Sequence, residues 1–355
     1  MRKPRLFSTL AAGLIAAISL NSHAAPKSDF SVCWTIYAGW MPWEYGAAEG
    51  IVDKWAKKYD INIDVVQIND YVESINQYSA GQFDGCTMTN MDALTIPAAG
   101  GVDSTALIIG DFSNGNDGVV LKGEKKTLGD LKGQNVNLVE LSVSHYLLAR
   151  GLEKAGLSER DLKVVNTSDA DLVAAFATSD VTAVTTWNPL LAEIEATPGV
   201  TKVFDSSQIP GEIIDLMVVN SDTLKDNPAF GKALTGAWYE IMATMSADTP
   251  AGKAAREHMA KASGTDLAGY EAQLAATKMF YSAKDAVAFA TSPKLPATMT
   301  KVAEFSFGHG LLGEGAQSAD AIGMSFAKGV VTGDKGNLKL RFDPSYMQMA
   351  ADGTL

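Results

Sequence analysis

The hydrophobic positions of the chain form short apolar runs that alternate with amphipathic stretches. Apolar runs of this length are typical of buried strands, and apolar positions three or four residues apart are typical of helices. The runs that predict strands cover residues 33–38, 61–68, 83–89, 105–112, 118–121, 135–140, 162–167 and 181–187. Helical patterns lie between them, at residues 46–59, 71–81, 144–154, 169–178 and 188–196. Strands that alternate with helices predict βαβ units and a mostly parallel sheet.

From Asn227 onward the pattern changes to long helical stretches with few strand signals, clearest at residues 230–245, 249–263, 268–278 and 295–312. The chain is expected to cross between two lobes twice, near residues 113–119 and 209–217. We therefore expect two α/β lobes with two crossing strands and a helical C-terminal region packed on the first lobe. The first lobe would hold residues 25–115, the second 116–212, and residues 213–355 would return to the first.

The first 24 residues carry the pattern of an export signal. Arg2, Lys3 and Arg5 precede the apolar run LFSTLAAGLIAAISL, and Ser22-His23-Ala24 gives a small-x-small cleavage pattern. The run is shorter than a transmembrane helix needs. We expect residues 1–24 to be a signal peptide that is removed from an exported protein.

The charge of the remaining chain argues against two classes of partner. Without the three basic residues of the leader, 26 of the 29 basic residues remain against 41 acidic ones, a net charge of −15. Nucleic acids and anionic membranes bind basic surfaces, so neither is expected as a partner.

Cys33 and Cys86 are the two cysteines of the chain. Export permits a disulfide, but both lie in apolar strand-like runs, where disulfide geometry is uncommon. Two buried free thiols are the favoured prediction and a bridge is the alternative. Neither cysteine has the histidine spacing of a zinc site, and His145, His258 and His309 are expected to be isolated, packed or solvated residues. No metal, cofactor or catalytic residue is predicted.

Three motifs resemble one known family. They are GQFDGCTMTN (81–90), TLGDLKGQNVNLVELSVSHYLLARGLEKAGL (127–157) and DADLVAAFATSDVTAVTTWNP (169–189). They are similar to the periplasmic binding proteins of ABC importers in the taurine, aliphatic sulfonate and nitrate group. Within that group the WMPWEYG stretch (40–46) looks most like the branch found beside urea carboxylase genes, which implies urea or guanidinium as ligand. The resemblance implies a type II periplasmic binding protein fold, a periplasmic location, a small-molecule ligand, and permease and ATPase subunits as partners. We expect a monomer.

The candidate site comes from the loops at the ends of the predicted strands, because ligands of such folds lie there between the lobes. These loops contain carboxylates and tryptophans but neither Lys nor Arg. Indole faces attract cations, and a carboxylate can pair with guanidinium through two hydrogen bonds. The sequence therefore predicts a pocket for a guanidinium-like cation or urea. The residues chosen as ligand-binding are Trp40, Trp43, Glu44, Asn90, Asp92, Asp111, Ser142, Ser144, Trp187, Asn188 and Asp215.

Most of these residues also have a purely structural interpretation. Trp40 and Trp43 can pack in a core, and Glu44 can serve the first turn of its own helix. Asn90, Asp92, Ser142 and Ser144 can cap helices, and Asp215 can simply belong to a crossing strand.

The sequence favours an exported receptor that closes around a small polar solute and delivers it to a membrane permease. The alternative is a taurine, sulfonate or nitrate-type anion receptor of the same fold, since helix N-termini and hydroxyls can hold an anion. A thiamine-pyrimidine-related binding protein or enzyme is a third interpretation. The export signal and the absence of a cysteine cluster argue against the enzyme. A sensor with the same pocket is a further alternative.

Overall fold

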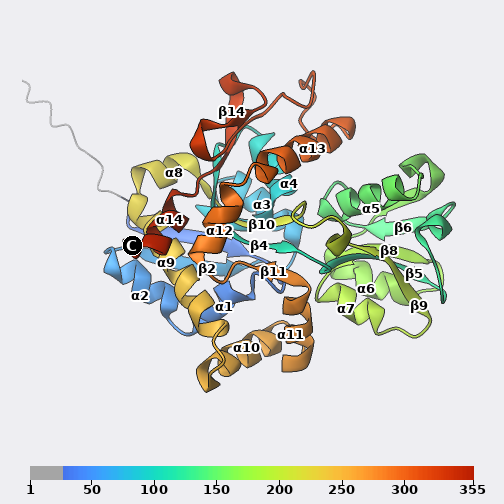
Figure 1. Ribbon diagram of the computed structural model, residues 1–355, viewed down its shortest axis with the longest axis horizontal. Coiled ribbons are helices and arrows are strands. Elements are labelled where there is room, and N and C mark those ends of the chain that lie inside the picture. Colours follow the sequence, from blue (N-terminus) through green and yellow to red (C-terminus); the bar gives the residue numbers. More distant parts are fainter. Residues whose placement is uncertain (1–26) are drawn as a thin grey trace, which may run out of the picture.

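Two β-sheets organise the residues that the computed structural model describes, 27–355 (Figure 1). The expected signal peptide at residues 1–24 lies outside this range. The larger sheet contains β1 (Asp29–Trp34), β2 (Asn62–Gln67), β3 (Gly85–Thr89), β4 (Ser104–Ser113), β10 (Ile214–Asn220), β11 (Thr277–Met279), β12 (Gly323–Ser325), β13 (Val331–Thr332) and β14 (Leu338–Phe342). Their order is β13-β12-β14-β4-β10-β3-β1-β2, and β11 pairs with β4. The central strands β3 and β4 are buried along almost their whole length, as strands covered on both faces of a sheet are.

The smaller sheet forms the second lobe, on the right of Figure 1. It contains β5 (Asp117–Lys122), β6 (Asn135–Leu138), β7 (Lys163–Asn166), β8 (Ala183–Trp187) and β9 (Val200–Asp205), in the order β7-β6-β8-β5-β9. Three helices lie with it: α5 (Val143–Lys154), α6 (Asp169–Ala177) and α7 (Leu190–Glu195). Ser142 caps α5 as expected, with its side chain accepting a hydrogen bond from the backbone of Ser144.

The other helices pack on the larger sheet or extend from it (Figure 1). They are α1 (Met41–Ala48), α2 (Ile51–Lys58), α3 (Tyr71–Ser79), α4 (Asn90–Ala93), α8 (Ser221–Asp226), α9 (Pro228–Met245), α10 (Pro250–Ala262), α11 (Leu267–Ala275), α12 (Ala283–Ala290), α13 (Lys294–Gly308) and α14 (Ser345–Asp352). A π-helical turn follows α4 at Leu94–Ala98. Short 3₁₀ turns lie at Leu128–Leu131, Glu159–Asp161, Ser206–Gln208, Ala327–Gly329 and Lys335–Asn337.

The chain passes from the larger sheet to the smaller one between β4 and β5, and it returns between β9 and β10. Since β4 and β10 are antiparallel neighbours, the outgoing and returning connections lie side by side. The expected divisions at 115/116 and 212/213 fall within these connections. A pair of adjacent strands leading into a second lobe is an arrangement that permits hinge motion.

The stretch from Trp40 to Gly46 differs from the expected loop. It is mostly helix, because α1 begins at Met41 with Pro42 in its first turn. Proline is tolerated there because its missing N–H would have no helical partner. The predicted helix at 46–59 is in fact two helices. Gly50, with a φ of 69°, separates α1 from α2 in a left-handed conformation that glycine adopts readily.

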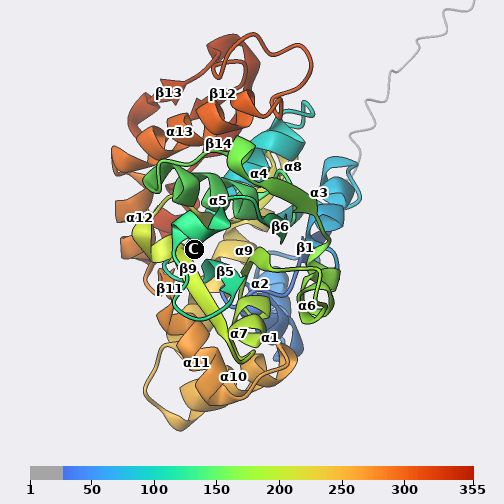
Figure 2. The same cartoon turned by 90° about the vertical axis from the view of Figure 1, so that its right-hand side faces the viewer.

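The C-terminal third is not purely helical. Figure 2 shows α13 with β12, β13 and β14 at the top of the view and α10 and α11 at the bottom, and these three strands extend the larger sheet. β14 pairs in parallel with β4, a strand more than 200 residues earlier in the sequence. Strands of two to five residues leave almost no periodic signal in a sequence. The positions of β12, β13 and β14 therefore depend on this long-range pairing.

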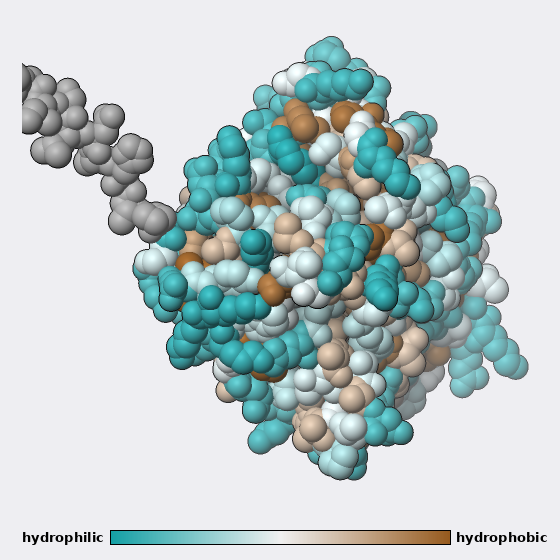
Figure 3. Space-filling model, turned by 60° about the vertical axis from the view of Figure 1, so that its left-hand side comes forward, coloured by the Kyte–Doolittle hydropathy of each residue, from teal (hydrophilic) through white to brown (hydrophobic). Residues whose placement is uncertain are grey.

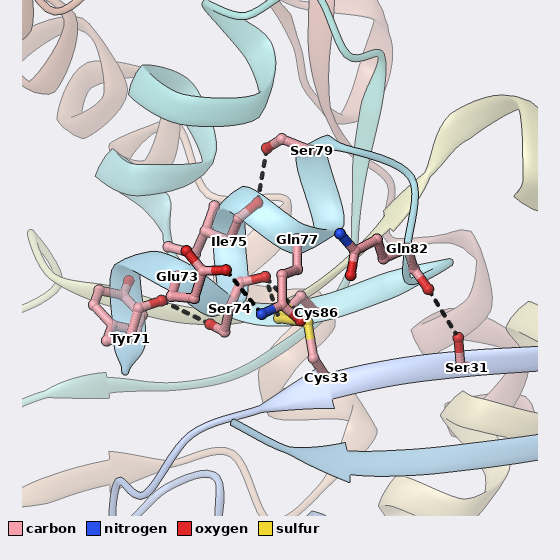
Figure 4. Close-up of a disulfide and its surroundings, with 10 residues drawn as sticks. All are labelled: Ser31, Cys33, Tyr71, Glu73, Ser74, Ile75, Gln77, Ser79, Gln82 and Cys86. Carbon is pink, nitrogen blue, oxygen red and sulfur yellow. Dashed lines mark hydrogen bonds between the residues drawn. A yellow bond between two sulfur atoms is a disulfide. The ribbon is translucent and has the colours of Figure 1, made fainter. Parts of the chain in front are cut away.

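Cys33 and Cys86 form a disulfide (Figure 4), so the favoured prediction of two free thiols was wrong. The two residues lie directly opposite each other on the parallel neighbours β1 and β3. Their Cα atoms are 4.4 Å apart, which is within the range that disulfides need. The general rarity of disulfides within sheets does not apply to a pair in such direct register.

The surface shows the usual mixture of residue types. On the face drawn in Figure 3, hydrophobic residues are scattered among hydrophilic ones. Within residues 27–355, no helix combines the length and apolar character that crossing a membrane requires.

Candidate functional site

A cavity with an empty volume of about 300 Å³, its mouth included, lies between the two lobes. Its walls come from the ends of strands and the starts of helices in both lobes, where the fold was expected to hold a ligand. Asp117 and Trp187 belong to β5 and β8 of the smaller sheet, and Asp215 belongs to β10 of the larger. The residues that line the cavity are Tyr37, Trp40, Tyr71, Thr89, Asp117, Val143, Trp187, Ile213 and Asp215. None of these nine is Lys, Arg or His.

Four aromatic rings form a continuous series around the cavity. The ring centroids of Tyr37 and Trp40 are 5.0 Å apart, and those of Trp40 and Tyr71 are 5.8 Å apart and stacked. Tyr71 then meets Trp187 edge to face at 5.8 Å. Because Trp187 comes from the second lobe and the other three from the first, this aromatic wall is complete only when the lobes are together.

Trp187 also lines a wider groove on its outer side. That groove has an empty volume of about 1300 Å³ and includes Asp169 and Glu193 from the second lobe and Gln273 from the first. The indole of Trp187 therefore lies between the inner cavity and the open groove. This is a position from which a side chain can cover a bound ligand.

The acidic lining residue Asp117 is the first residue of β5. It is 3% exposed and accepts a hydrogen bond from Ser113 Oγ, at the end of β4. Burial raises its pKa to about 7, with a further rise from the charge of Asp92, while the Ser113 hydrogen bond lowers it. A carboxyl in this state exchanges its proton near neutral pH.

Asp215 and Asp111 form a second acidic group. They face each other across β10 and β4, and Tyr37 donates a hydrogen bond of 3.1 Å to Asp111 Oδ1. Burial raises the pKa of both carboxyls, and the charge of Asp111 raises that of Asp215 further. Both Oδ2 atoms are buried without a hydrogen-bond partner among residues 27–355. Asp215 lines the cavity, and Asp111 lies behind Tyr37.

Gly39 makes room for this acidic pair. A Cβ at that position would lie 2.4 Å from Asp111 Oδ2 and 2.7 Å from the Tyr37 ring. The backbone of the stretch before α1 can therefore approach Asp111 only because residue 39 has no side chain.

Asp92 also lies behind the lining residues. Its Oδ2 accepts hydrogen bonds from Tyr71 Oη at 2.6 Å and from Thr89 Oγ1 at 2.7 Å. Burial raises its pKa to about 6, although these two hydrogen bonds act in the opposite direction. Asp92 thus fixes the position of two lining side chains without lining the cavity itself.

Trp40, Trp187 and Asp215 are the members of the predicted site that line the cavity, with Asp92 and Asp111 just behind. The structure places Trp43 away from it: its ring packs on Trp238 with centroids 5.2 Å apart, and only 1% of the residue is exposed. The structure also places Glu44 elsewhere, because it contacts His258 Nε2 at 2.8 Å. The core and local interpretations apply to these two residues.

The side chains of Asn90 and Asn188 form hydrogen bonds with the main chain. Asn90 donates to Glu212 O at 3.1 Å and accepts from the backbone N–H of Ile214 at 3.0 Å, so it fixes the connection that returns to β10. Asn188 accepts from the N–H of Ala192 in the first turn of α7. Neither is among the lining residues.

The two serines lie at the start of α5, whose first residue, Val143, lines the cavity. Ser142 donates to Val139 O at 2.7 Å and caps the helix. Ser144 Oγ is buried without a hydrogen-bond partner among the described residues. This hydroxyl is a spare polar group close to the cavity wall.

Sequence reasoning did not select Tyr37, Tyr71, Thr89, Asp117, Val143 or Ile213. Tyr71 had a usable signal, because it follows directly on the loop at the end of β2. Asp117 was among the strand-end carboxylates, but nothing in the sequence separated it from the exposed ones.

His145 is packed, as expected, with 3% of the residue exposed, but His309, which was expected to lie alone, is beside it. Their ring centroids are 5.1 Å apart, and both approach Glu159. The three side chains have the residue types of a metal site. They come from distant parts of the chain, so no local spacing could reveal them.

The two α/β sheets joined by adjacent crossings, with a cavity between them, define a type II periplasmic binding protein fold. The chain belongs to the NMT1/THI5-like family, whose profile matches residues 55–248.

Solved structures share this fold at low sequence identity. The alkanesulfonate-binding protein SsuA of Xanthomonas axonopodis pv. citri, bound to MOPS, is 17% identical with a TM-score of 0.66, over 82% of this chain and 96% of that one. The aliphatic sulphonate binding protein SsuA of Escherichia coli is 19% identical with a TM-score of 0.67, over 81% and 94%. The nitrate-binding protein NrtA of Synechocystis PCC 6803 is 12% identical with a TM-score of 0.56, over 93% and 100%.

Two curated relatives match shorter stretches. A protein of Brucella abortus (strain 2308), provisionally named a binding protein, is 29% identical over 139 residues, which are 38% of this chain and 43% of that relative. A provisionally named aliphatic sulfonates-binding protein of Escherichia coli K12 is 36% identical over 84 residues, 24% of this chain and 26% of the relative. The chain thus matches less than half the length of either.

Proposed function

We propose that this protein is the solute-binding component of an ABC importer and that it captures a small solute between its lobes in the periplasm. The leader pattern, the fold and the family support this role. The partners would be a membrane permease and its ATPase. No enzymatic step is proposed.

For the ligand, we propose a small planar cation of the guanidinium type, or urea. The observation that carries this proposal is the lining of the cavity: two buried carboxyls, Asp117 and Asp215, stand among four aromatic rings, and no basic side chain lines the same space. Aromatic faces attract a flat cation, and ionised carboxylates can accept its N–H groups. Without a cation, these buried carboxyls hold protons near neutral pH, since an unpaired buried charge is costly. A cation can replace those protons.

A sulfonate or nitrate-type anion is the second candidate, and the comparisons favour it. Several relatives and solved structures that resemble this chain are named for aliphatic sulfonates or nitrate. Two features of the site also favour an acceptor in the ligand. The Nε1–H of Trp40 is buried without a hydrogen-bond partner within residues 27–355, and a protonated carboxyl can donate to an anionic oxygen. Urea has an acceptor for Trp40, whereas guanidinium has none.

Thermal-shift titration of the mature chain tests the role and the ligand together, with guanidinium, urea, taurine, alkanesulfonates and nitrate as probes. A ligand that binds the folded state stabilises it by RT ln(1 + [L]/Kd), about 2.7 kcal/mol at one hundred times Kd. Guanidinium is used at micromolar to low millimolar concentration, below its denaturing range. We expect stabilisation by guanidinium or urea. A shift with a sulfonate or nitrate and none with guanidinium or urea would overturn the ligand class but keep the receptor role.

A further inference from the structure

The two lobes also touch away from the cavity, along one face of α13. Lys301, Phe305 and His309 recur every four residues, so they lie on the same side of this helix and its C-terminal end. Figures 1 and 2 show α13 beside α5 of the second lobe, and Phe305 on this side of α13 meets the rings of His145 and Tyr146 on α5. We call this contact the α5–α13 seam; its members are Lys301, Phe305 and His309 from the first lobe, His145, Tyr146, Arg150 and Glu159 from the second, and Glu212 from the returning connection.

Glu212 bridges the seam nearest the crossing strands. It accepts hydrogen bonds from Tyr146 Oη at 2.6 Å and Arg150 Nε at 2.9 Å on α5, and from Lys301 Nζ at 3.1 Å on α13. Burial acts to raise its pKa, but these three hydrogen bonds outweigh burial and lower it. Glu212 therefore stays ionised near neutral pH.

Glu159 bridges the far end of the seam. Its Oε1 lies 2.8 Å from His309 Nε2 of the first lobe, and its Oε2 lies 3.3 Å from His145 Nε2 of its own lobe. The contact with His145, followed by that with His309, lowers the pKa of Glu159 to about 2 despite its burial. An ionised carboxylate thus faces two imidazole rings.

The surroundings of the ring nitrogens indicate where the protons are. His309 Nδ1 lies 2.8 Å from the backbone oxygen of Phe305, while Nε2 faces Glu159. Both nitrogens face acceptors, and a neutral imidazole has a single N–H. Both contacts are hydrogen bonds only if His309 is an imidazolium. In the neutral ring, one contact would set two lone pairs against each other.

His145 needs no extra proton. Its Nδ1 accepts a hydrogen bond of 3.2 Å from the backbone N–H of Leu141. The neutral ring then carries its proton on Nε2, on the side of Glu159. His145 is 3% exposed, so this orientation is held by the packing around it.

We propose that closing of the lobes binds a proton at His309, so that the α5–α13 seam is a latch that favours the closed state at acidic pH. The proposal rests on the lobe motion of the proposed function but on no particular ligand. The sign follows from linkage. If the closed state binds one proton more than the open state, a fall in pH favours closing, and a rise in pH removes that preference.

The other charged groups that face the seam do not titrate in the relevant range. Glu159 and Glu212 stay ionised, and the contacts with Glu212 outweigh burial and raise the pKa of Arg150. Burial and the Glu212 contact raise the pKa of Tyr146, so its phenol stays neutral. The remaining seam members with a titratable ring are the two imidazoles, the side-chain type whose charge commonly changes near neutral pH.

A bound metal ion is the competing explanation for the same cluster, because ligand atoms of His145, Glu159 and His309 all lie within 4.8 Å of one another. A histidine that binds a metal normally donates from its other nitrogen. His309 satisfies this condition through Phe305. His145 does not, because its Nδ1 accepts from Leu141. The donor arrangement therefore favours a proton over a metal.

The test measures lobe separation without ligand. Spin labels at Lys57→Cys in the first lobe and Thr197→Cys in the second report the open and closed populations between pH 5.5 and 8. We expect the ratio of closed to open to rise as pH falls, by at most about tenfold per pH unit for one proton. In His309→Gln we expect this dependence to weaken, leaving only what the interlobe carboxyls Asp117 and Asp215 contribute. His258→Gln is the matched control, since His258 pairs with Glu44 on elements of one lobe and should keep the dependence.

A second measurement identifies the proton directly. The ring ¹⁵N shifts of the three histidines of the mature chain, assigned from the single variants, should show His309 as imidazolium and His145 with its proton on Nε2 at pH 6. Three results would overturn the latch: His309→Gln that keeps the wild-type pH dependence, a single distance from pH 5.5 to 8, or Zn²⁺ alone closing the lobes at pH 7.5. Because no solute is present, failure of the ligand screen leaves these results interpretable.

Discussion

Asp111 and Asp215 lie directly opposite each other on the antiparallel strands β4 and β10, where both connections to the second lobe begin. Both are buried, and each has one carboxyl oxygen without a hydrogen-bond partner among residues 27–355. Two buried carboxylates this close together cannot both stay ionised unless another group compensates their charge. In the ligand-free protein a proton does so, and we propose that in the complex a cationic solute does.

The pH dependence of binding should therefore reveal the charge of the ligand. The raised pKa values of Asp111, Asp117 and Asp215 mean that these carboxyls lose their protons near or above pH 7. A cation needs them ionised, so its affinity should rise with pH from 5.5 to 8.5, whereas an anion that needs them protonated should bind less well over the same range. Isothermal titration calorimetry measures this, and the same series in His309→Gln removes the contribution of the seam.

Asp215→Asn should separate binding from stability. Loss of a buried carboxylate that pairs with a cation typically costs about 2 kcal/mol or more, so guanidinium affinity should fall by at least about 30-fold. Unfolding of the ligand-free variant at pH 8 should become less favourable, because a group whose pKa is raised on folding lowers stability as pH rises through that range. Asp226→Asn, on an exposed position of α8, is the control. Equal losses of binding and stability would contradict a direct role of Asp215.

Two tryptophan variants should behave in opposite ways. Trp187→Ala removes the side chain between the cavity and the outer groove, and we expect it to weaken ligand binding roughly tenfold or more with a smaller loss of stability than Trp43→Ala, because Trp187 borders two open spaces. Trp43→Ala leaves a void against Trp238 in the core, and we expect a loss of about 3–5 kcal/mol in the free energy of unfolding. Urea denaturation and calorimetry on the two variants measure both quantities. Weak binding in a stable Trp43→Ala protein would restore the original prediction that Trp43 contacts ligand.

Gly39→Ala should damage the site through Asp111. The added methyl group would lie 2.4 Å from Asp111 Oδ2, so the carboxyl or the backbone must shift. We expect weaker ligand binding and a changed pH dependence. Gly308→Ala, at a position where a Cβ meets nothing within 4 Å, is the control. Unchanged binding in Gly39→Ala would show that the acidic pair does not contribute to the ligand site.

Reduction of the disulfide should lower stability without affecting the site. Cys33 and Cys86 are 53 residues apart, and closing a loop of that length is worth roughly 4 kcal/mol in the chain-entropy account. The double variant Cys33→Ser and Cys86→Ser should show a lower Tm than the oxidised protein, and dithiothreitol should reproduce the loss in the wild type. If dithiothreitol lowers the Tm of the double variant equally, the effect does not come from this bond.

The alternation of strands and helices was readable because each element has its own local period. The same holds for the cap at Ser142, where a side chain satisfies the backbone of its own helix. The sequence also selected Trp40, Trp187 and Asp215, which line the interlobe cavity, since the ends of strands in such folds meet at the interlobe cleft.

Other features depend on which distant segments become neighbours, and no local pattern contains that information. The local sequence around Trp43 is typical of a pocket residue, but its ring packs against Trp238 in the folded protein. The position of Glu44 is likewise typical of a pocket carboxylate, but its side chain contacts His258, which is 214 residues later in the sequence. The disulfide likewise depends on the register of β1 against β3.

The sequence by itself determined the fold class, the acidic and aromatic chemistry of the strand ends, and the absence of basic residues from the loops that it selected. Tertiary structure decided which carboxyls are buried together, because the pKa of an acid depends on its distance from water and from other charges. It also brought His145, Glu159 and His309 to the junction of the two lobes, from parts of the chain up to 164 residues apart. The periodicity of a sequence indicates on which face of its own helix or strand a residue lies. Whether a charged side chain on that face is compensated depends on the groups from other segments that pack against it.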